Sequence, residues 1–373
     1  MTRTVRNLVL ATALVSATGT AFAARQGVEP TLRNPLAMRM VADSSSRQPF
    51  MGVVEFKITN NSAESLRVPY WQLPSATGES NLFKVYRDGA RVEYRGALVK
   101  RPAPTEADFV SFRPYETKLF TVDLSSAYDL SRTGEYTVTF ASMLQGAKTG
   151  SGRKLSDAMG RMGQLRSAPL KLWVDANNTL TALKGGGNTS AKGKPGSGGT
   201  VVGGVTYVGC SSTQISGAGA GVTQARSYTE NAKGYLNGGT VGARYTTWFG
   251  AYSSSRYSTA QQHFVAIDSA MDQIGGKIKI NCGCNQNYYA YVYPTKPYEI
   301  FVCRAFWSAP TGGTDSKGGT LVHEMSHFNV VAGTDDVVYG QSGAKSLAIS
   351  NPDGALNNAD SHEYFAENTP NQN

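Results

Sequence analysis

Alternation of apolar and polar residues marks the first half of the chain. The segment Gly134–Phe140 alternates strictly, as a strand with one buried face does. Turn-forming residues such as Asp88-Gly89 separate it from similar runs. The strands predicted in this way are Gly52–Thr59, Leu82–Tyr86, Ala90–Tyr94, Lys118–Val122, Gly134–Phe140 and Leu170–Val174. Several short strands at this spacing predict an antiparallel β-sandwich of immunoglobulin-like type over residues 24–183.

A helical period replaces this alternation in the second half. Ser211–Leu236 and Tyr257–Ile274 are both predicted to be helices. The second of these places apolar residues on one face, namely Phe264, Ile267, Ala270, Met271 and Ile274. Two β-like runs, Tyr288–Tyr293 and Ile300–Val302, predict a short sheet beside a later helix. Residues 205–373 are therefore expected to form a mainly helical α+β domain with a core of its own.

The N-terminus has the features of a secretory signal peptide at residues 1–23. Arg3 and Arg6 precede the apolar run Leu8–Val15, and Ala21-Phe22-Ala23 supplies the small residues of a cleavage site. The apolar run is far shorter than the roughly 20 residues that span a membrane. The protein is therefore expected to be exported, with no membrane partner.

A segment of low complexity divides the rest of the chain. Residues 184–204 consist mostly of Gly, Ser, Thr and Lys, which cannot bury an apolar surface and predict a flexible linker. Such a segment is a good site for proteolytic cleavage. The predicted order is thus a signal peptide, a β-sandwich at 24–183, a linker at 184–204 and a second domain at 205–373.

Charge and chemically reactive residues divide at the same place. All four histidines and all four cysteines lie after residue 204. Residues 205–373 carry 10 Lys and Arg against 12 Asp and Glu, whereas the rest carries 26 against 15, so the net charges are −2 and +11. Because the basic half faces a mildly acidic half of the same chain, an intramolecular contact is expected rather than a nucleic-acid partner.

His323 and His327 lie four residues apart, with Glu324 directly after the first. On a helix, expected to begin near Lys317–Thr320 and to end before Gly333, residues i and i+4 leave the same face. Two imidazoles beside a carboxylate form the His-Glu-x-x-His arrangement of zinc peptidases, in which the carboxylate takes a proton from the metal-bound water. A catalytic zinc usually has three protein ligands, so this pair needs a third.

The next residues, Gly333-Thr334-Asp335-Asp336-Val337-Val338-Tyr339-Gly340, resemble the Gly-Thr-x-Asp-x-x-Tyr-Gly motif of the aspzincins, the deuterolysin-like metallopeptidases. The resemblance implies that Asp336 is the third ligand and that Tyr339 donates a hydrogen bond to the oxyanion. Asp335 is expected to be a solvated neighbour of Asp336. A competing interpretation keeps both histidines and takes Glu363 as the third ligand, as in the gluzincins.

The segment Asn357–Asn368 resembles the C-terminal Asn-Ala-Asp…Glu-x-Phe-Ala element of the peptidyl-Lys metalloendopeptidases within the same family. In these relatives, acidic residues matching Asp360 and Glu363 line the pocket for the residue just after the scissile bond. The alternative is a helix N-terminus made acidic to suit the helix dipole. His362 is expected to be solvated or to support the metal site from behind, and His263 to be a surface or packing residue.

The four cysteines, Cys210, Cys282, Cys284 and Cys303, suit an exported protein and permit three pairings. Cys282 and Cys284 are poorly placed to pair with each other because one residue separates them. The resemblance to the Lys-specific aspzincins extends over residues 205–373, and it implies the disulfides Cys210–Cys282 and Cys284–Cys303.

The resemblance describes a secreted zinc metalloendopeptidase with one Zn2+ per chain, made as a latent proenzyme, that cleaves proteins or peptides on the amino side of Lys. The β-sandwich is expected to be a propeptide that acts as an intramolecular inhibitor on a monomeric chain; the alternative is a permanent accessory domain. One lysine of the propeptide or linker is expected to occupy the acidic pocket as a substrate lysine would. The candidates are Lys148, Lys154, Lys184, Lys192 and Lys194. Two other functions stay open: a deuterolysin-like peptidase without Lys preference, and an exported binding or toxin-like protein with a structural zinc.

Overall fold

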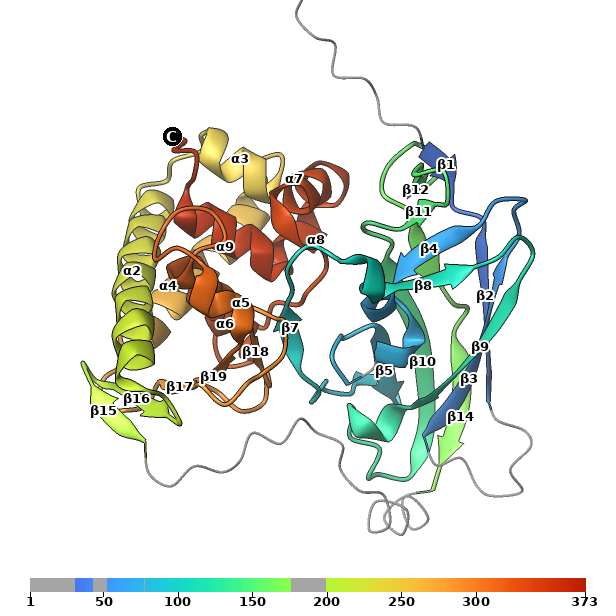
Figure 1. Cartoon of the computed structure of the whole chain (residues 1–373), viewed down its shortest axis with the longest axis horizontal. Helices are drawn as coiled ribbons and strands as arrows, with labels where there is room; N and C mark the ends of the chain where they lie inside the picture. The colour runs from blue at the N-terminus through green and yellow to red at the C-terminus, as the bar shows by residue number, and fades with distance from the viewer. Residues whose placement is uncertain (1–30, 43–51, 77, 176–198) are drawn as a thin grey trace, which may run out of the picture.

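The structure is a computed structural model that describes residues 31–42, 52–76, 78–175 and 199–373. The predicted signal peptide and residues 184–198 of the predicted linker lie outside these ranges. Two bodies lie side by side, a β-rich one formed by the N-terminal half and a mainly helical one formed by the C-terminal half (Figure 1).

The N-terminal half is built from short strands, as the alternation predicts. They are β1 (Thr31–Arg33), β2 (Leu36–Ala42), β3 (Val53–Asn60), β4 (Leu66–Pro69), β5 (Phe83–Arg87), β6 (Ala90–Arg91), β7 (Leu98–Lys100), β8 (Phe109–Phe112), β9 (Thr117–Asp123), β10 (Gly134–Met143), β11 (Lys148–Thr149), β12 (Lys154–Ser156), β13 (Gln164–Arg166) and β14 (Leu170–Val174). Within the described ranges, all of these except β7 form three sheets, ordered β2-β3-β9, β13-β10-β5-β6 with β14 also on β10, and β1-β12-β11-β4-β8. The β-rich character is confirmed, and the immunoglobulin-like type stays a prediction.

Strand β10 shows why this half has its own core. Its burial alternates residue by residue, so that Tyr136, Val138 and Phe140 face inward. The Phe140 ring lies 5.3 Å from the ring of Phe83 and 6.0 Å from that of Phe56, measured between centroids. The strand predicted at Ala90–Tyr94 is shorter than expected and ends at Arg91, and Tyr94 is buried and forms a separate bridge to Tyr128.

The C-terminal half surrounds one mixed sheet with helices. Its strands are β15 (Thr200–Val202), β16 (Val205–Val208), β17 (Lys279–Asn281), β18 (Ala290–Val292) and β19 (Glu299–Val302). Its helices are α2 (Ser212–Asn237), α3 (Ala243–Phe249), α4 (Ser254–Met271), α5 (Arg304–Ser308), α6 (Lys317–His327), α7 (Gly340–Ser350), α8 (Pro352–Leu356) and α9 (Ala359–Glu367). Strand β15 lies within the predicted linker and pairs with β16, so this sheet begins earlier than predicted.

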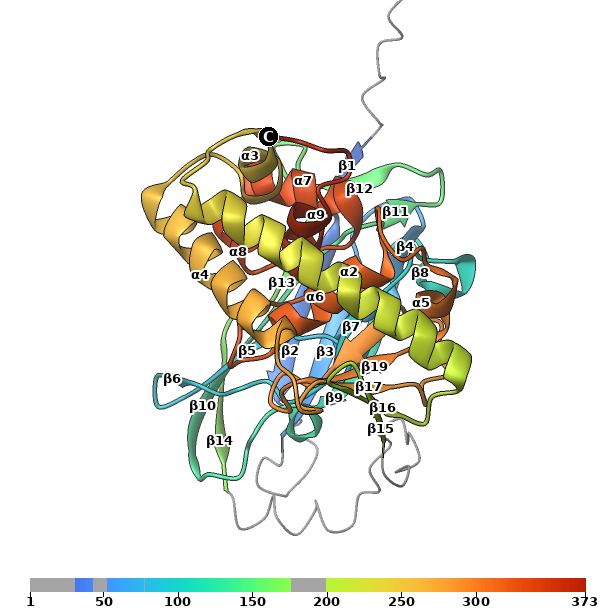
Figure 2. The same cartoon turned by 90° about the vertical axis from the view of Figure 1, so that its left-hand side faces the viewer.

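The long helices α2 and α4 cover the layer that contains α6, and α2 runs diagonally across the face seen in Figure 2. Helix α2 begins with a capping box in which Ser211 and Gln214 bond to each other's backbone N–H groups. Helix α4 ends at Met271, which corrects the prediction that Ile274 belongs to its buried face. Gly275 and Gly276 adopt positive φ angles of 75° and 77°, so the chain turns away and Ile274 is 71% exposed.

The N-terminal half contributes one strand to the C-terminal sheet. The sheet has the order β15-β16-β17-β19-β18-β7, so β7 is its last strand. Strand β7 pairs antiparallel with β18, with Lys100 opposite Ala290, Val99 opposite Tyr291 and Leu98 opposite Val292. In Figure 1, β7 lies between the two bodies. The pattern of the sequence did not predict this strand.

Both disulfides implied by the resemblance are confirmed. Cys210 pairs with Cys282, joining the ends of the neighbouring strands β16 and β17, and Cys284 pairs with Cys303 at the end of β19. Among the described residues, no helix combines the length and the apolar character needed to cross a membrane.

Candidate active site

Helix α6 carries His323, Glu324 and His327, and every residue of this helix is buried. Ser316 caps its start by accepting a hydrogen bond from the backbone N–H of Gly319. The two imidazole rings leave the same side of the helix, with their centroids 4.8 Å apart. The predicted geometry of residues i and i+4 is therefore present.

The loop after α6 brings Asp336 back to this pair. Gly333 turns the chain with a φ angle of +60°, and the hydroxyl groups of Ser326 and Thr334 lie 2.6 Å apart, which fastens the loop to the helix. The Oδ1 atom of Asp336 lies 3.1 Å from Nε2 of His323 and 3.4 Å from Nε2 of His327. Two nitrogen atoms and one carboxylate oxygen thus converge on one point.

These three side chains fit a zinc ion. Three ligand atoms are buried without a hydrogen-bond partner: Nε2 of His323, Nε2 of His327 and Oδ1 of Asp336. The possible ligand atoms of these residues lie within 4.8 Å of one another, close enough to share one ion. Nδ1 of His327 lies 3.0 Å from the carbonyl oxygen of Thr334, so a partner outside the site orients that ring. Burial opposes ionisation of Asp336, but the two histidines hold the pKa of its carboxyl well below the usual range.

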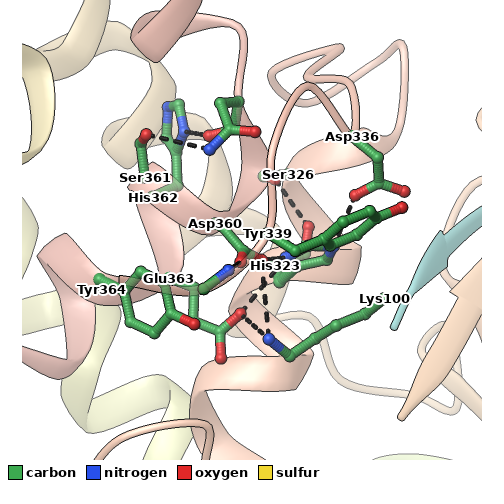
Figure 3. A network of polar contacts seen from close by, with 12 residues as sticks. Lys100, His323, Ser326, Asp336, Tyr339, Asp360, Ser361, His362, Glu363 and Tyr364 are labelled. Atoms are coloured by element: carbon green, nitrogen blue, oxygen red, sulfur yellow. Dashed lines mark hydrogen bonds and ion pairs between the residues drawn. The ribbon is translucent and has the colours of Figure 1, made fainter. Parts of the chain in front are cut away.

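Glu363, the alternative third ligand, lies on the other side of His323. Its Oε2 atom is 3.3 Å from Nδ1 of His323, and the Oδ1 atom of Asp360 is 2.8 Å from the same nitrogen (Figure 3). The nitrogen atoms of His323 therefore divide between two groups of carboxylates. Only the Nε2 side also includes His327, which favours Asp336 as the third ligand.

Glu324 and Tyr339 flank the predicted metal site. Both carboxylate oxygens of Glu324 are buried without a hydrogen-bond partner, and burial raises the pKa of this carboxyl well above its usual value. The hydroxyl of Tyr339 donates a hydrogen bond to the carbonyl oxygen of Val99 at 2.9 Å. Its backbone N–H donates to Oε1 of Gln145 at 2.6 Å, and the side-chain amide of Gln145 donates to its carbonyl oxygen, so the N-terminal half makes three hydrogen bonds to Tyr339.

The acidic pocket contains a lysine of the N-terminal half. Nζ of Lys100 lies 2.6 Å from Oε2 of Glu363 and 3.6 Å from Oδ1 of Asp360 (Figure 3). The same atom lies 3.4 Å from Oδ1 of Asp315. It also lies 5.1 Å from the ring centroid of Tyr289. Burial alone would lower the pKa of Lys100, but Asp360 and Glu363 hold it well above its usual value.

Lys100 and Asp315 were missed by the sequence analysis. Lysines are rarely buried, so the run Ala97-Leu98-Val99-Lys100 gave no reason to place Lys100 inside the molecule. The only available signal was a lysine at the end of a short apolar run. Lys148 and Lys154, which were expected as candidates, lie instead in β11 and β12 of the N-terminal sheets, and Lys184, Lys192 and Lys194 lie outside the described residues.

Three further expectations need correction or refinement. Asp335 is half-buried rather than solvated and accepts a hydrogen bond from the side-chain amide of Asn81 at 2.8 Å, because its loop lies against the N-terminal half. His362 is fully buried in the helical core rather than solvated. Its Nε2 atom lies 3.0 Å from Nδ1 of His263, which makes His263 a packing residue as expected.

Comparisons with known proteins agree with this geometry. Residues 236–367 match the family model described as lysine-specific metallo-endopeptidase, an aspzincin family. The chain is 40% identical over 322 residues to an extracellular protease of Aeromonas hydrophila, an alignment that covers 86% of this chain and 89% of that protein. It is 37% identical over 286 residues to a peptidyl-Lys metalloendopeptidase of Grifola frondosa, covering 76% of each protein.

A second fungal protein and one solved structure are also similar. A peptidyl-Lys metalloendopeptidase of Pleurotus ostreatus is 51% identical over 167 residues, which cover 44% of this chain and 98% of that protein. A solved zinc peptidase from Grifola frondosa is 46% identical, with a TM-score of 0.42, and the match covers 44% of this chain and 100% of that one.

Proposed function

The chain belongs to the aspzincin family of lysine-specific metallo-endopeptidases, and from this premise we propose that it is secreted as a latent precursor and cleaves peptides on the amino side of Lys. It is a zinc metalloendopeptidase, and its substrates are peptides. The single observation that carries the proposed specificity is the ammonium group of Lys100 among the carboxylates of Asp315, Asp360 and Glu363.

His323, His327 and Asp336 are the residues that would hold one zinc ion per chain. When bound, zinc polarises the scissile carbonyl group and makes a water molecule more acidic. Glu324 takes the proton of the attacking water and returns it to the leaving amine, a task that suits a buried carboxylate without other partners. Tyr339 donates its hydroxyl to the carbonyl oxygen as that oxygen gains negative charge.

Selectivity for Lys follows from the cost of burying a charge. An ammonium group leaves water at a high cost unless opposite charges and hydrogen bonds replace the water. Three carboxylates around one point offer that replacement to a compact cation, as they do for Lys100. Arginine carries the same charge on a longer, planar group, so it should fit this pocket less well.

A structural zinc site is not favoured, because such sites use four protein ligands and only three side chains converge here among the described residues. A peptidase without Lys preference would leave the buried carboxylates of the acidic pocket without a positively charged substrate residue to pair with.

Digestion of a mixed peptide library by the processed protein, read by mass spectrometry, tests the proposed activity. We expect cuts on the amino side of Lys, fewer before Arg, and none by the Glu324→Ala variant, which should keep its zinc. Cuts before hydrophobic residues would contradict Lys specificity, and a fully active Glu324→Ala variant would contradict the mechanism.

Latency and self-processing have separate support. The N-terminal half contacts Tyr339, Asp336 and the acidic pocket, so a substrate cannot reach these groups while the contacts persist. The predicted linker contains Lys184, Lys192 and Lys194, at which an enzyme of this specificity would separate the halves of its own chain. We expect the wild-type monomer to mature to a fragment that begins between residues 184 and 205, whereas Glu324→Ala should accumulate as the full precursor. Normal maturation of a pure Glu324→Ala preparation would contradict self-processing.

A further inference from the structure

We propose that strand β7 lies in the substrate cleft in the register of a bound substrate, with the Val99–Lys100 peptide bond at the catalytic centre. Lys100 then occupies the place of the residue just after the scissile bond, and this lysine keeps the N-terminal half in its inhibitory position. The inference rests on the proposed function and names the segment that regulates the site. Four observations, each independent of the others, carry it.

The first observation is the place of β7 in the sheet. Strand β7 is the last strand of the C-terminal sheet and comes from a different half of the chain; among the residues that the structure describes, it pairs with β18 alone. Without β7, the backbone of β18 would have a free edge. Extended peptides commonly bind proteins by adding a strand to such an edge. The antiparallel pairing of β7 with β18 is therefore the pairing that a peptide substrate would make.

The second observation is that catalytic groups contact both polar groups of Val99. The backbone N–H of Val99 donates to Oδ2 of Asp336 at 2.8 Å, which leaves Oδ1 of that carboxylate facing the histidines. The carbonyl oxygen of Val99 accepts the hydroxyl of Tyr339 at 2.9 Å. Because Tyr339 is the proposed donor to the scissile carbonyl, this contact aligns the Val99–Lys100 bond with the bond that is cut.

The third observation is the match between Lys100 and the pocket. The side chain of Lys100 is 2% exposed and that of Glu363 0%, and their charged atoms lie 2.6 Å apart. The backbone of Lys100 is also held by the C-terminal half, since Tyr289 donates its N–H to the carbonyl oxygen of Lys100 at 3.0 Å. The backbone contacts and the side-chain pocket thus both place Lys100 directly after the bond that would be cut.

The fourth observation explains why β7 would inhibit. Residues of the N-terminal half hold the segment at both ends: Ala97 N–H donates to Gly78 O at 2.9 Å, and the Arg101 guanidinium bonds to Glu79 at 3.0 Å and to Tyr70 at 3.0 Å. A segment that is already ordered in its bound shape loses little entropy on binding. It therefore competes strongly with a flexible peptide, and its anchored ends oppose the movement that cleavage requires.

A binding measurement on the full-length precursor tests this proposal without relying on catalysis. All proteins carry Glu324→Ala and are loaded with zinc, and the probe is a fluorescein-labelled hexapeptide with one central lysine, followed by fluorescence anisotropy. We expect weak binding to the parent and at least tenfold tighter binding after Lys100→Met. The same peptide with Met in place of lysine should bind weakly to both. Lys84→Ala, at an exposed lysine of β5, is the matched control and should behave as the parent does.

Lys100→Arg is a second variant in case Lys100→Met does not fold, because it keeps the positive charge beside the carboxylates. It should also bind the lysine peptide more tightly than the parent, and circular dichroism checks the fold of each protein. Equal affinity of the parent and every folded Lys100 variant would overturn the proposal, as would tight binding by the parent. A lack of Lys preference in digests by the processed wild-type enzyme would instead contradict the proposed function, so the two failures are distinguishable.

Discussion

The Nδ1 atom of His323 lies 2.8 Å from Oδ1 of Asp360, and the same oxygen lies 3.6 Å from Nζ of Lys100. One carboxylate therefore contacts both a proposed zinc ligand and the lysine in the acidic pocket. Carboxylates that accept the second N–H of a metal-bound histidine orient the ring and strengthen it as a ligand. In this arrangement, metal binding and substrate selection depend on a shared residue.

Asp360→Asn should therefore weaken two properties at once. We expect zinc affinity to fall by about tenfold, at the lower end of the 10- to 100-fold range for such partners, because the neutral amide stabilises the ring less well. The Lys preference should fall too. Glu363→Gln is the matched control, since it removes a pocket charge that is farther from His323, at 3.3 Å, and should reduce Lys preference with less effect on zinc. Chelator competition and a cleavage-site survey measure the two properties; unchanged zinc affinity in Asp360→Asn would contradict the shared role.

The two neighbouring aspartates should differ sharply. Asp336→Ala removes the carboxylate that meets both histidines, so we expect the processed protein to lose its zinc in dialysis. Asp335→Ala should keep zinc, because Asp335 contacts Asn81 of the N-terminal half instead. Metal analysis after dialysis measures both. The reverse result would place the ligand one residue earlier, and zinc loss in Glu363→Ala with retention in both aspartate variants would favour the gluzincin interpretation.

Much of the helical half could be predicted because its signals are local. Ser211 and Gln214 cap α2, and the spacing of His323 and His327 requires only one turn of helix. The period failed at Ile274, which continues the apolar pattern although α4 has already ended at Met271 and two glycines with positive φ angles follow directly. The motif from Gly333 to Gly340 could be aligned with a family because its residues are adjacent in sequence.

The contact between the halves could not be predicted, because its signals are not local. Strand β7 has three residues, too few to show a period, and its partner β18 lies nearly 200 residues farther along the chain. Lys100 contradicts the general preference of lysine for the surface, and only the positions of Asp315, Asp360 and Glu363 explain its burial. Nothing in the sequence near Lys100 contains that information.

Tyr339→Phe should separate zinc binding from turnover. The phenyl ring keeps the shape of the side chain but removes the hydroxyl that contacts the carbonyl oxygen of Val99. In the processed enzyme we expect zinc to be retained and kcat to fall by about 10²-fold or more, the usual scale for losing one oxyanion donor. Steady-state kinetics on a single-lysine peptide measures this, with zinc content as the control. A variant with wild-type kcat would exclude Tyr339 from the proposed role.

Folding stability should decrease in mild acid because of the pair His263 and His362. The Nδ1 atom of His362 donates to the carbonyl oxygen of Asn358 at 3.0 Å, so its Nε2 accepts from Nδ1 of His263 at 3.0 Å. Burial lowers the pKa of His263 to about 4, and burial together with His263 lowers the pKa of His362 to about 3. The unfolded chain takes up these protons below about pH 6.5, whereas the folded chain does not, so the free energy of unfolding falls as the pH drops from about 6.5 toward 4.

Urea unfolding of the full-length Glu324→Ala protein at pH 7.5 and 5.0, with zinc chelated throughout, measures this loss of stability. His263→Gln can still donate a hydrogen bond to His362 but cannot titrate, so we expect its loss between the two pH values to be smaller by about 1–2 kcal/mol. Comparing the two proteins removes the contribution of the other titrating groups, because both proteins contain them. An equal loss of stability in the two proteins would show that His263 takes up its proton in the folded chain as readily as in the unfolded chain, which would contradict a pKa lowered by burial.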